Sequence, residues 1–296
     1  MQADSGETIN LGDLRDTMLS YEIEKTCRSS SLLISATSDL SAGGSGTLVT
    51  YRHLCGILTA THVVATHTGA CEIYSAIGTG GATYYSPLER IEVMKLMYGE
   101  TCDGIEALKN GEGGWPEGAL DICFIQLSPD EFNRVLRISG KKAINLLEQK
   151  TKYIEKREKY ISFDNNHNFL WAIYGYPRAK TIKTSCGILE SEYDGVYLTG
   201  GKFTTQPLRL VSRPFDGDAD VGHHEFGSTD DPLPSRFNGI SGGGVWQISL
   251  CGGRSHIKIG EIFFSGVCVA TRGRCLLTRG PSALYDIFLP GLEEIS

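Results

Sequence analysis

The sequence lacks long apolar stretches and clusters of basic residues, and these absences exclude two classes of partner. No stretch reaches the roughly 18 apolar residues that a membrane helix needs, and the start, MQADS, has neither the basic residues nor the apolar run of a secretion signal. The formal charge is −7, and no group of neighbouring Lys and Arg could neutralise a phosphate backbone. We therefore expect a soluble, cytoplasmic protein that binds neither a membrane nor nucleic acid.

Cysteine is not scarce, but no two cysteines have the C-x-x-C spacing of a metal or redox site. The nine cysteines are an odd number and are spread along the chain, which argues against both a disulfide framework and a structural zinc ion. In a reducing compartment, cysteines serve as small buried hydrophobic residues. We expect all nine to be reduced thiols, and we expect no cofactor.

Apolar residues occur in short runs, and these runs predict strands. With 41% hydrophobic residues among 296, the chain can bury a full core. Gly, Ser, Asn and Pro separate the runs, and the 36 glycines suit the tight turns and bulges of antiparallel barrels. The runs form two series, the first at residues 32–36, 46–51, 55–60, 71–77, 91–97 and 119–127, and the second at residues 169–174, 195–198, 208–211, 244–248, 257–270 and 275–278.

Helical patterns are confined to the ends of the chain. Residues 11–25 have apolar residues at helical spacing, and residues 281–289 have an apolar stripe after an early proline, so each segment is expected to form a short helix. We interpret the first helix as an appendage and the polar run at 150–159 as a connector between the two series. The glycine-rich segment 99–118 is interpreted as an exposed insertion. The expected division is an N-terminal extension at 1–29, a first domain at 30–150 and a second domain at 151–296.

Two segments present a histidine and an aspartate suited to acyl transfer. An apolar hairpin ends in GILTATHVV at residues 56–64, which puts His62 at the rim of a barrel. An imidazole there, with a pKa near about 6.5, takes up and returns a proton at neutral pH. In ALDICFIQL at residues 119–127, Asp121 is the single carboxylate of an apolar strand. Because an unpaired buried charge is costly, we expect Asp121 to pair with His62 and to hold one imidazole tautomer.

A third segment, NGISGGGVW at residues 238–246, places glycines on both sides of Ser241. Glycine lets the backbone turn sharply, and such a turn exposes the serine hydroxyl. The turn also directs the backbone N–H groups of Gly239 and Ser241 to one point, which is the requirement of an oxyanion hole. Ser241 is therefore the candidate nucleophile.

Together, the three segments resemble the motifs of chymotrypsin-like (trypsin-like) serine peptidases, particularly the bacterial and HtrA-type members. TATH at 59–62 is similar to T-A-A-H, DI at 121–122 to the start of D-I-A-L, and GISGG at 239–243 to G-D-S-G-G. The order His, Asp, Ser is also that of the family. The resemblance covers residue 30 to the C-terminus. It implies an all-β fold of two antiparallel six-stranded β-barrels, with a short N-terminal helical extension and a C-terminal helix.

The resemblance also implies an activity and a role for each residue. Ser241 would be the nucleophile, His62 the general base and then the general acid, and Asp121 the residue that orients His62. The reaction would be hydrolysis of peptide bonds in a protein or peptide substrate, through an acyl-enzyme. Family members with intact motifs can lack activity, so a catalytically silent two-barrel protein-binding module is the alternative. Labelling of Ser241 by a fluorophosphonate probe would distinguish the two.

The resemblance places a substrate pocket near Ser235, Val269 and Thr271. If GV at 266–267 matches the family's G-I, Val269 replaces the serine that usually supports the aspartate. Ile240 stands where digestive members have the aspartate that pairs with a newly cut N-terminus, so that route of activation is excluded. Restraint would then come from narrow specificity or from a regulatory protein partner. Residues 11–25 and 99–118 are the candidate docking surfaces, and a bacterial stress or defence pathway is the suggested setting.

Two other chemistries deserve comparison with this interpretation. His223 and His224, with carboxylates at positions 216, 218, 220 and 225, are potential metal ligands. Adjacent side chains of an extended segment point in opposite directions, so we expect a solvated loop there and no metal. An ester hydrolase with the same triad would normally have the order Ser, Asp, His on a parallel sheet. The order in this chain argues against it.

Overall fold

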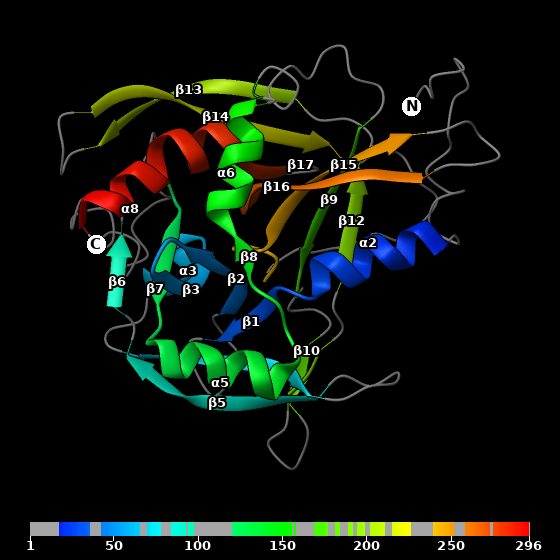
Figure 1. Ribbon diagram of the computed structural model, residues 1–296, viewed down its shortest axis with the longest axis vertical. Coiled ribbons are helices and arrows are strands. Elements are labelled where there is room, and N and C mark those ends of the chain that lie inside the picture. Colours follow the sequence, from blue (N-terminus) through cyan, green and yellow to red (C-terminus); the bar gives the residue numbers. More distant parts are fainter. Residues whose placement is uncertain are drawn as a thin grey trace.

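The fold was obtained as a computed structural model, and it consists mostly of β-structure in two sheets (Figure 1). The structure describes residues 18–35, 43–65, 70–77, 84–92, 94–97, 120–155, 157, 169–176, 181–183, 189–191, 194–198, 202–210, 215–225, 239–251, 258–272 and 275–295. Among these residues, the longest helices are too short to cross the apolar layer of a membrane. The predicted insertion at 99–118 and residues 11–17 of the predicted first helix lie outside the described residues.

The first sheet contains ten strands, most of them antiparallel. Its order is β10-β11-β5-β4-β1-β2-β3-β7-β6, and the short strand β8 pairs with β2 in parallel. The strands are β1 (Ser31–Ser35), β2 (Gly43–Tyr51), β3 (Leu54–Thr59), β4 (Ala70–Ile77), β5 (Tyr84–Glu92), β6 (Met94–Met97), β7 (Cys123–Gln126), β8 (Ile144–Asn145), β10 (Thr181–Lys183) and β11 (Leu189–Ser191).

The second sheet contains seven antiparallel strands in the order β12-β9-β15-β16-β17-β14-β13. The strands are β9 (Phe169–Gly175), β12 (Asp194–Leu198), β13 (Lys202–Leu210), β14 (Phe215–Glu225), β15 (Gly244–Cys251), β16 (Lys258–Arg272) and β17 (Cys275–Arg279). The segment with His223 and His224, which we expected to be a solvated loop, is instead strand β14, paired on both edges. The alternation of Asp at positions 216, 218 and 220 has the period of a strand and is the sequence signal for β14.

The prediction of two closed six-stranded barrels is only partly right. Both sheets are present, and the described pairings leave each sheet open, with ten and seven strands. Strands β10 and β11 join the first sheet through β5, although their residues follow position 150. Apolar runs indicate where strands lie, whereas the choice of edge partner depends on contacts between distant segments. The division of domains at residue 150 stays a prediction.

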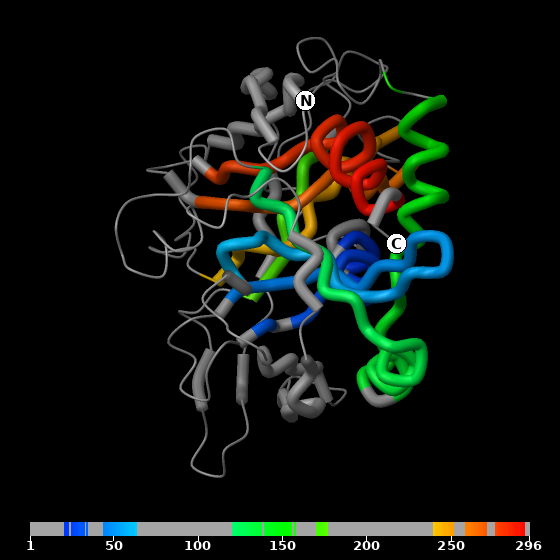
Figure 2. The backbone as a smooth tube through the Cα atoms, turned by 90° about the vertical axis from the view of Figure 1, so that its left-hand side faces the viewer, coloured from blue at the N-terminus to red at the C-terminus, as the bar shows by residue number. Residues whose placement is uncertain are grey.

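Among the described residues, six helical segments accompany the two sheets, and one of these segments bridges the sheets. They are α2 (Met18–Arg28), α3 (Thr61–Ala65), α5 (Pro129–Ser139), α6 (Leu146–Glu155), the π-helical segment η2 (Ser282–Phe288) and α8 (Leu289–Ile295). Helix α6 contacts β2 and also accepts a hydrogen bond from β16, where Phe264 N–H donates to Gln149. The C-terminal helix lies beside α6 (Figure 2), and Tyr153 joins the two by donating to Asp286.

The N-terminal helix is part of the fold and not an appendage. Ile23 is 1% exposed and Cys27 is fully buried, and both belong to the main hydrophobic cluster. Ile23, one of the apolar residues that predicted the helix, therefore lies on its buried face. The side chain of Lys141 donates to the carbonyl of Arg28 at 2.8 Å and caps the end of α2. The predicted helix at 281–289 is confirmed by η2 and the start of α8.

Two hydrophobic clusters fill the interior. The larger draws on both sheets, α2, α6, η2 and α8, and contains buried aromatic residues such as Tyr174, Phe264 and Phe288. The smaller lies under β1, β2, β3, β7 and α5, and Val269 of the second sheet joins it. The cysteines whose side chains the structure describes, at positions 27, 55, 123, 251 and 268, are thiols. Because both clusters contain residues from the two sheets, docking of the sheets is coupled to burial of the core.

Candidate active site

His62 lies at the junction of a buried strand and a short helix. Strand β3 ends at Thr59, and helix α3 begins at Thr61, so His62 falls in the first turn, as the predicted rim position requires. The N–H groups of a first helical turn have no partners within the helix. The backbone N–H of His62 donates to Asp121 Oδ1 at 3.1 Å. The carboxylate therefore fixes the backbone of His62 as well as its side chain.

The imidazole of His62 and the carboxylate of Asp121 form a close ion-pair geometry. Nδ1 of His62 lies 2.9 Å from Oδ2 and 3.2 Å from Oδ1 of Asp121. The side chain of His62 is 33% exposed, and that of Asp121 is 6% exposed. An ionised carboxylate only accepts hydrogen bonds, so the hydrogen of a neutral His62 belongs on Nδ1. This tautomer leaves the lone pair on Nε2, where it can act as a base.

The surroundings of His62 act on its pKa in opposite directions. Burial alone would lower the pKa, because it disfavours the charged imidazolium. The charge of Asp121 and the hydrogen bond from His62 to Asp121 raise it. The net result is a pKa of His62 above its ordinary value. The pair therefore stabilises the protonated imidazolium that a general base forms when it accepts a proton.

The sheet itself brings Asp121 to His62. Strand β7 pairs with β3 so that Thr59 faces Cys123. Asp121 precedes β7 by two residues, and His62 follows Thr59 by three, so both lie beyond the same end of this strand pair. The backbone N–H of Thr61 also donates to the carbonyl of Asp121 at 3.4 Å. The register of β3 and β7 thus places Asp121 beside His62.

Ser241 lies on a tight turn between the two sheets. The N–H of Gly243 donates to the carbonyl of Ile240 at 2.8 Å, which closes the turn. Gly239 and Gly242 have φ values of 97° and 84°, in the left-handed region that favours glycine. The N–H of Gly242 donates to the carbonyl of Cys268 on β16 at 2.7 Å, which anchors the turn to the second sheet. Ser241 itself is half-buried.

Ser45 on β2 anchors the same turn to the first sheet. Its backbone N–H donates to the carbonyl of Ser241 at 2.7 Å, and its hydroxyl donates to the carbonyl of Gly239 at 2.8 Å. The hydroxyl also accepts the N–H of Tyr176 at 2.8 Å, and the carbonyl of Ser45 accepts the hydroxyl of Thr59 at 2.7 Å. Ser45 therefore holds the carbonyls on both sides of Ile240 in fixed orientations. Sequence reasoning missed Ser45, although it stands in the small-residue run GGSG before a predicted strand.

Gly44 marks the point where the serine turn meets the histidine helix. A Cβ atom on Gly44 would lie 2.8 Å from the carbonyl oxygen of Ser241 and 2.6 Å from Cγ2 of Val63. Contacts this short are not tolerated, so glycine is required for the close approach. Gly44 therefore lies between the carbonyl of Ser241 and the side chain of Val63, which is the residue after His62. The structure brings together the segments of all three predicted residues, and the hydrogen bonds of His62 described above are to Asp121.

The structure describes two of the three predicted pocket residues. Ser235 lies outside the described residues, and Thr271 contributes its backbone to β16, opposite Leu276. Val269 is 7% exposed and packs in the smaller hydrophobic cluster with Val63. The pocket stays a prediction. Within the described part of the chain, His, Cys, Asp and Glu side chains do not gather in a group of three that could hold a metal ion.

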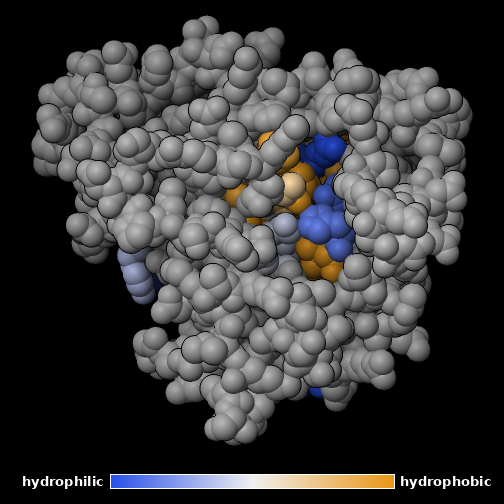
Figure 3. Space-filling view, turned by 180° about the vertical axis from the view of Figure 1, so that it is seen from behind, coloured by the Kyte–Doolittle hydropathy of each residue, from blue (hydrophilic) through white to orange (hydrophobic). Residues whose placement is uncertain are grey.

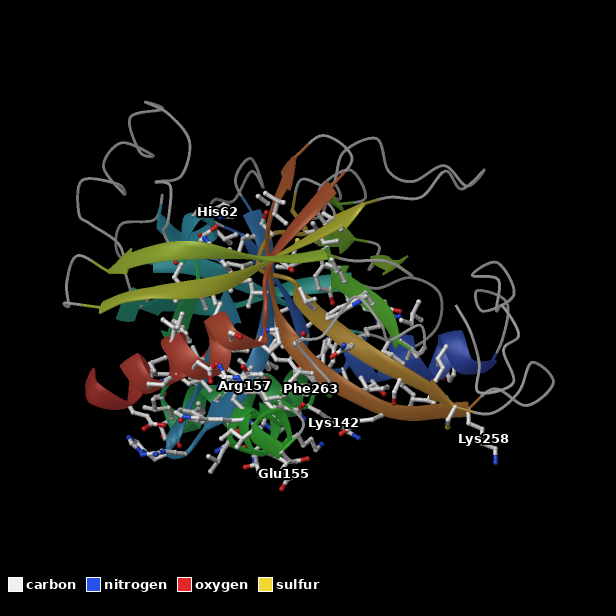
Figure 4. The ribbon with its side chains drawn as sticks, turned by 90° about the horizontal axis from the view of Figure 1, so that it is seen from above. His62, Lys142, Glu155, Arg157, Lys258 and Phe263 are labelled. Atoms are coloured by element: carbon white, nitrogen blue, oxygen red, sulfur yellow. The ribbon has the colours of Figure 1, made fainter. Side chains whose placement is uncertain are left out.

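His62 lies on the side of the molecule away from helix α6. In Figure 4, it lies far from Glu155, the last residue of α6, and from Arg157, toward the side of the molecule that faces away in Figure 1. Figure 3 shows that side, where hydrophilic and hydrophobic residues adjoin in one patch.

Comparison with known proteins gives distant structural likenesses. No protein-family model and no curated protein matches the sequence. Among solved structures, the chain is similar to an inactive serine-to-alanine mutant of Rv3671c from M. tuberculosis H37Rv, with 8% identity, a TM-score of 0.43, and coverage of 93% of this chain and 94% of the other. A human pathogenic astrovirus serine protease has 12% identity, a TM-score of 0.32 and coverage of 85% and 89%.

A third likeness is to the thermostable serine protease AL20 from an extremophilic microorganism. It has 12% identity, a TM-score of 0.36 and coverage of 87% of this chain and 93% of the other. TM-scores of this size do not establish a shared fold. The function has to be inferred from the geometry of the chain itself.

Proposed function

We propose that this chain is a serine endopeptidase in which Ser241, His62 and Asp121 form a catalytic triad. The observation that carries the proposal is the contact of both Asp121 carboxylate oxygens with His62, one of them 2.9 Å from Nδ1. A carboxylate so placed leaves Nε2 as the base. The turn that carries Ser241 is hydrogen-bonded to β2. Strand β2 pairs with β3, and β3 leads to His62.

The proposed reaction assigns one step to each residue. Ser241 Oγ attacks the carbonyl carbon of a peptide bond, and its proton passes to Nε2 of His62. Asp121 stabilises the imidazolium and keeps its orientation. His62 then delivers the proton to the leaving amine, and the acyl group stays on Ser241 as an ester. Water, activated by the same base, hydrolyses the ester and restores the enzyme.

The N–H groups of Gly239 and Ser241 would stabilise the oxyanion that forms in each half of the reaction. The left-handed backbone of Gly239 supports this assignment, since a residue with a side chain rarely adopts it. The two hydrogen bonds from Ser45 fix the carbonyls of Gly239 and Ser241 before substrate binds. Donors that need no rearrangement contribute most to stabilisation of a transition state.

The proposal is tested by hydrolysis of a broad peptide library by the purified chain and its Ser241→Ala variant. We expect cleavage by the wild type and a loss of about 10⁴-fold or more in the variant, with unchanged circular dichroism, because the hydroxyl contributes little to packing. Equal cleavage by both proteins would contradict the assignment. No cleavage by a folded wild type would favour the silent binding module.

We propose further that the activity is restrained, either by narrow specificity or by a regulatory protein partner. The support is the sequence at Ile240, which cannot form the zymogen salt bridge of digestive relatives. The isolated chain would then hydrolyse casein slowly and prefer few sites in the library. Rapid and indiscriminate digestion of casein would contradict this part of the proposal and leave the triad intact.

A further inference from the structure

Asp121 has a backbone conformation that a residue with a side chain rarely adopts. Its φ is 51°, in the left-handed region, and Arg52 is the other non-glycine residue with positive φ among those described. Arg52 lies in the two-residue turn between β2 and β3, where positive φ is common. Asp121 is buried at the approach to a strand. A left-handed residue in such a place is strained and persists only when its surroundings hold it.

The peptide groups on both sides of Asp121 are held by hydrogen bonds. The carbonyl of Leu120 accepts a hydrogen bond from Arg279 Nε at 2.9 Å. The carbonyl of Asp121 accepts the N–H of Thr61 at 3.4 Å. The φ angle of Asp121 describes how the Leu120–Asp121 peptide plane is rotated about the N–Cα bond. The bond from Arg279 to the oxygen of that plane therefore fixes the rotation that is unusual.

Arg279 reaches this carbonyl from the other sheet. It is the last residue of β17, opposite Val267 of β16, and it is 6% exposed. A Cβ atom on the neighbouring Gly266 would lie 1.9 Å from the carbonyl oxygen of Arg279, so the two backbones approach as closely as glycine allows. The backbone from which the guanidinium extends is thus tightly held. Arginine is rarely buried unless its donors are engaged.

We propose that Arg279 is a positioning residue that makes the orientation of Asp121 depend on the docking of the two sheets. The inference rests on the proposed function, because it assigns Arg279 a role in the triad. By holding the carbonyl of Leu120, Arg279 sets the backbone from which the Asp121 carboxylate reaches both the N–H and Nδ1 of His62. The base would be aligned only when β17 lies in place beside the first sheet.

The test compares Arg279→Met, which removes the donor and keeps an apolar side chain, with Arg279→Lys, which keeps a cation. We expect Arg279→Met to lower kcat about 10- to 100-fold with KM nearly unchanged, because misplacement of a reacting group affects the chemical step. Arg279→Lys should recover part of the loss. Arg134→Met is the matched control, since it removes a guanidinium that donates to Glu131 of its own helix, α5, and its kcat should equal that of the wild type.

A second measurement reads the His62–Asp121 hydrogen bond without any turnover. At low pH, the proton between His62 Nδ1 and Asp121 should give a far-downfield NMR resonance. Loss of this resonance in Asp121→Asn would assign it to that proton. We expect Arg279→Met to shift or remove this resonance and Arg134→Met to leave it in place. If Arg279→Met does not fold, Arg279→Leu, whose side chain also carries no donor, takes its place.

The outcomes separate the two proposals. If the variant of Arg279 without a donor folds and keeps both the wild-type kcat and the wild-type NMR resonance, Arg279 does not orient Asp121. The peptidase assignment then still stands. If the wild type hydrolyses no peptide, the proposed function fails, and the resonance alone decides whether Arg279 orients Asp121. A lowered kcat with an unchanged resonance would also overturn the inference, because the loss would then arise elsewhere.

Discussion

Two regions of the molecule hold charged side chains in contact, and they differ in burial and in backbone geometry. At the site, the Asp121 side chain is 6% exposed, its backbone is left-handed, and a buried arginine holds the preceding carbonyl. Along the helices, Arg157 contacts Asp286 at 2.8 Å with side-chain exposures of 57% and 32%. Glu293 of α8 accepts the hydroxyl of Tyr51 and contacts Lys150 at 3.5 Å.

The difference indicates different tasks. Exposed ion pairs contribute about 0–1 kcal/mol each, and their loss is easily tolerated. The contacts of α6, η2 and α8 therefore each add a small amount of stability to the packing of the C-terminal helix. Buried charges and left-handed residues reduce stability and are retained where the arrangement itself is needed. Substitutions at the site should mainly change activity, and substitutions along the helices should mainly change stability.

The largest effect expected from this comparison belongs to Asp121→Asn. The amide cannot accept the Nδ1–H bond in the same way and favours the other imidazole tautomer, so kcat/KM should fall about 10⁴-fold. Steady-state hydrolysis of a library-derived peptide measures it, with urea unfolding as the check on folding. If Asp103→Asn, outside the described residues, abolishes activity while Asp121→Asn does not, the wrong acid has been assigned.

Ser45→Ala should have the next largest effect. It removes the hydroxyl that donates to Gly239 and accepts from Tyr176, so the oxyanion turn loses one fixed carbonyl. We expect a fall of about 10- to 100-fold in kcat. Ser139→Ala is the matched control on α5, because that hydroxyl also donates to a carbonyl and accepts a backbone N–H. Equal kcat values in the two variants would remove Ser45 from the positioning of the turn.

Activity and stability should also depend on pH, in opposite directions. Only neutral His62 accepts a proton, so activity should fall at low pH with a midpoint above about 6.5, because Asp121 raises the pKa of His62. Residual activity of Asp121→Asn should have a midpoint at lower pH, since burial alone lowers that pKa. For stability the sign is opposite. The raised pKa adds stability that is present below the unfolded pKa of about 6.5 and is lost as pH rises through the folded pKa.

Tyr153→Phe should have the smallest effect, and it acts on stability. Burial raises the pKa of Tyr153, so its hydroxyl stays protonated and donates to Asp286 at 2.8 Å. Loss of this hydrogen bond should lower the free energy of unfolding by about 1 kcal/mol. Urea denaturation measures the change, and kcat should stay within about twofold of the wild type, as expected for a contact distant from the chemistry. A tenfold loss of kcat would show that the helices also influence the site.

Much of the secondary structure could be predicted because apolar runs report burial directly. The runs at 46–51 and 55–60 became β2 and β3, and His62 follows β3 as expected. Helix α5 was missed, although Ser128, Pro129, Asp130 and Glu131 open it and Gly140 ends it in a left-handed cap. Those residues are ordinary signals of a helix start and end, so the sequence itself indicates this helix.

The site could be predicted only in part, because its members differ in the kind of signal they leave. His62, Asp121 and Ser241 stand out by residue type in apolar or glycine-rich surroundings. Ser45 and Arg279 act through hydrogen bonds to backbone carbonyls, and such bonds depend on how distant segments pack. A serine among glycines and an arginine at a strand end have no distinctive pattern. Their roles require the coordinates of both sheets.

Covalent labelling of Ser241 tests directly whether His62 activates this serine. The folded chain is treated with a fluorophosphonate probe, and the modified peptide is identified by mass spectrometry in the wild type and in His62→Ala. We expect modification of Ser241 in the wild type and very little in His62→Ala, because an unactivated serine reacts poorly. A folded wild type that is not modified at Ser241, or equally fast labelling of both proteins, would contradict the account.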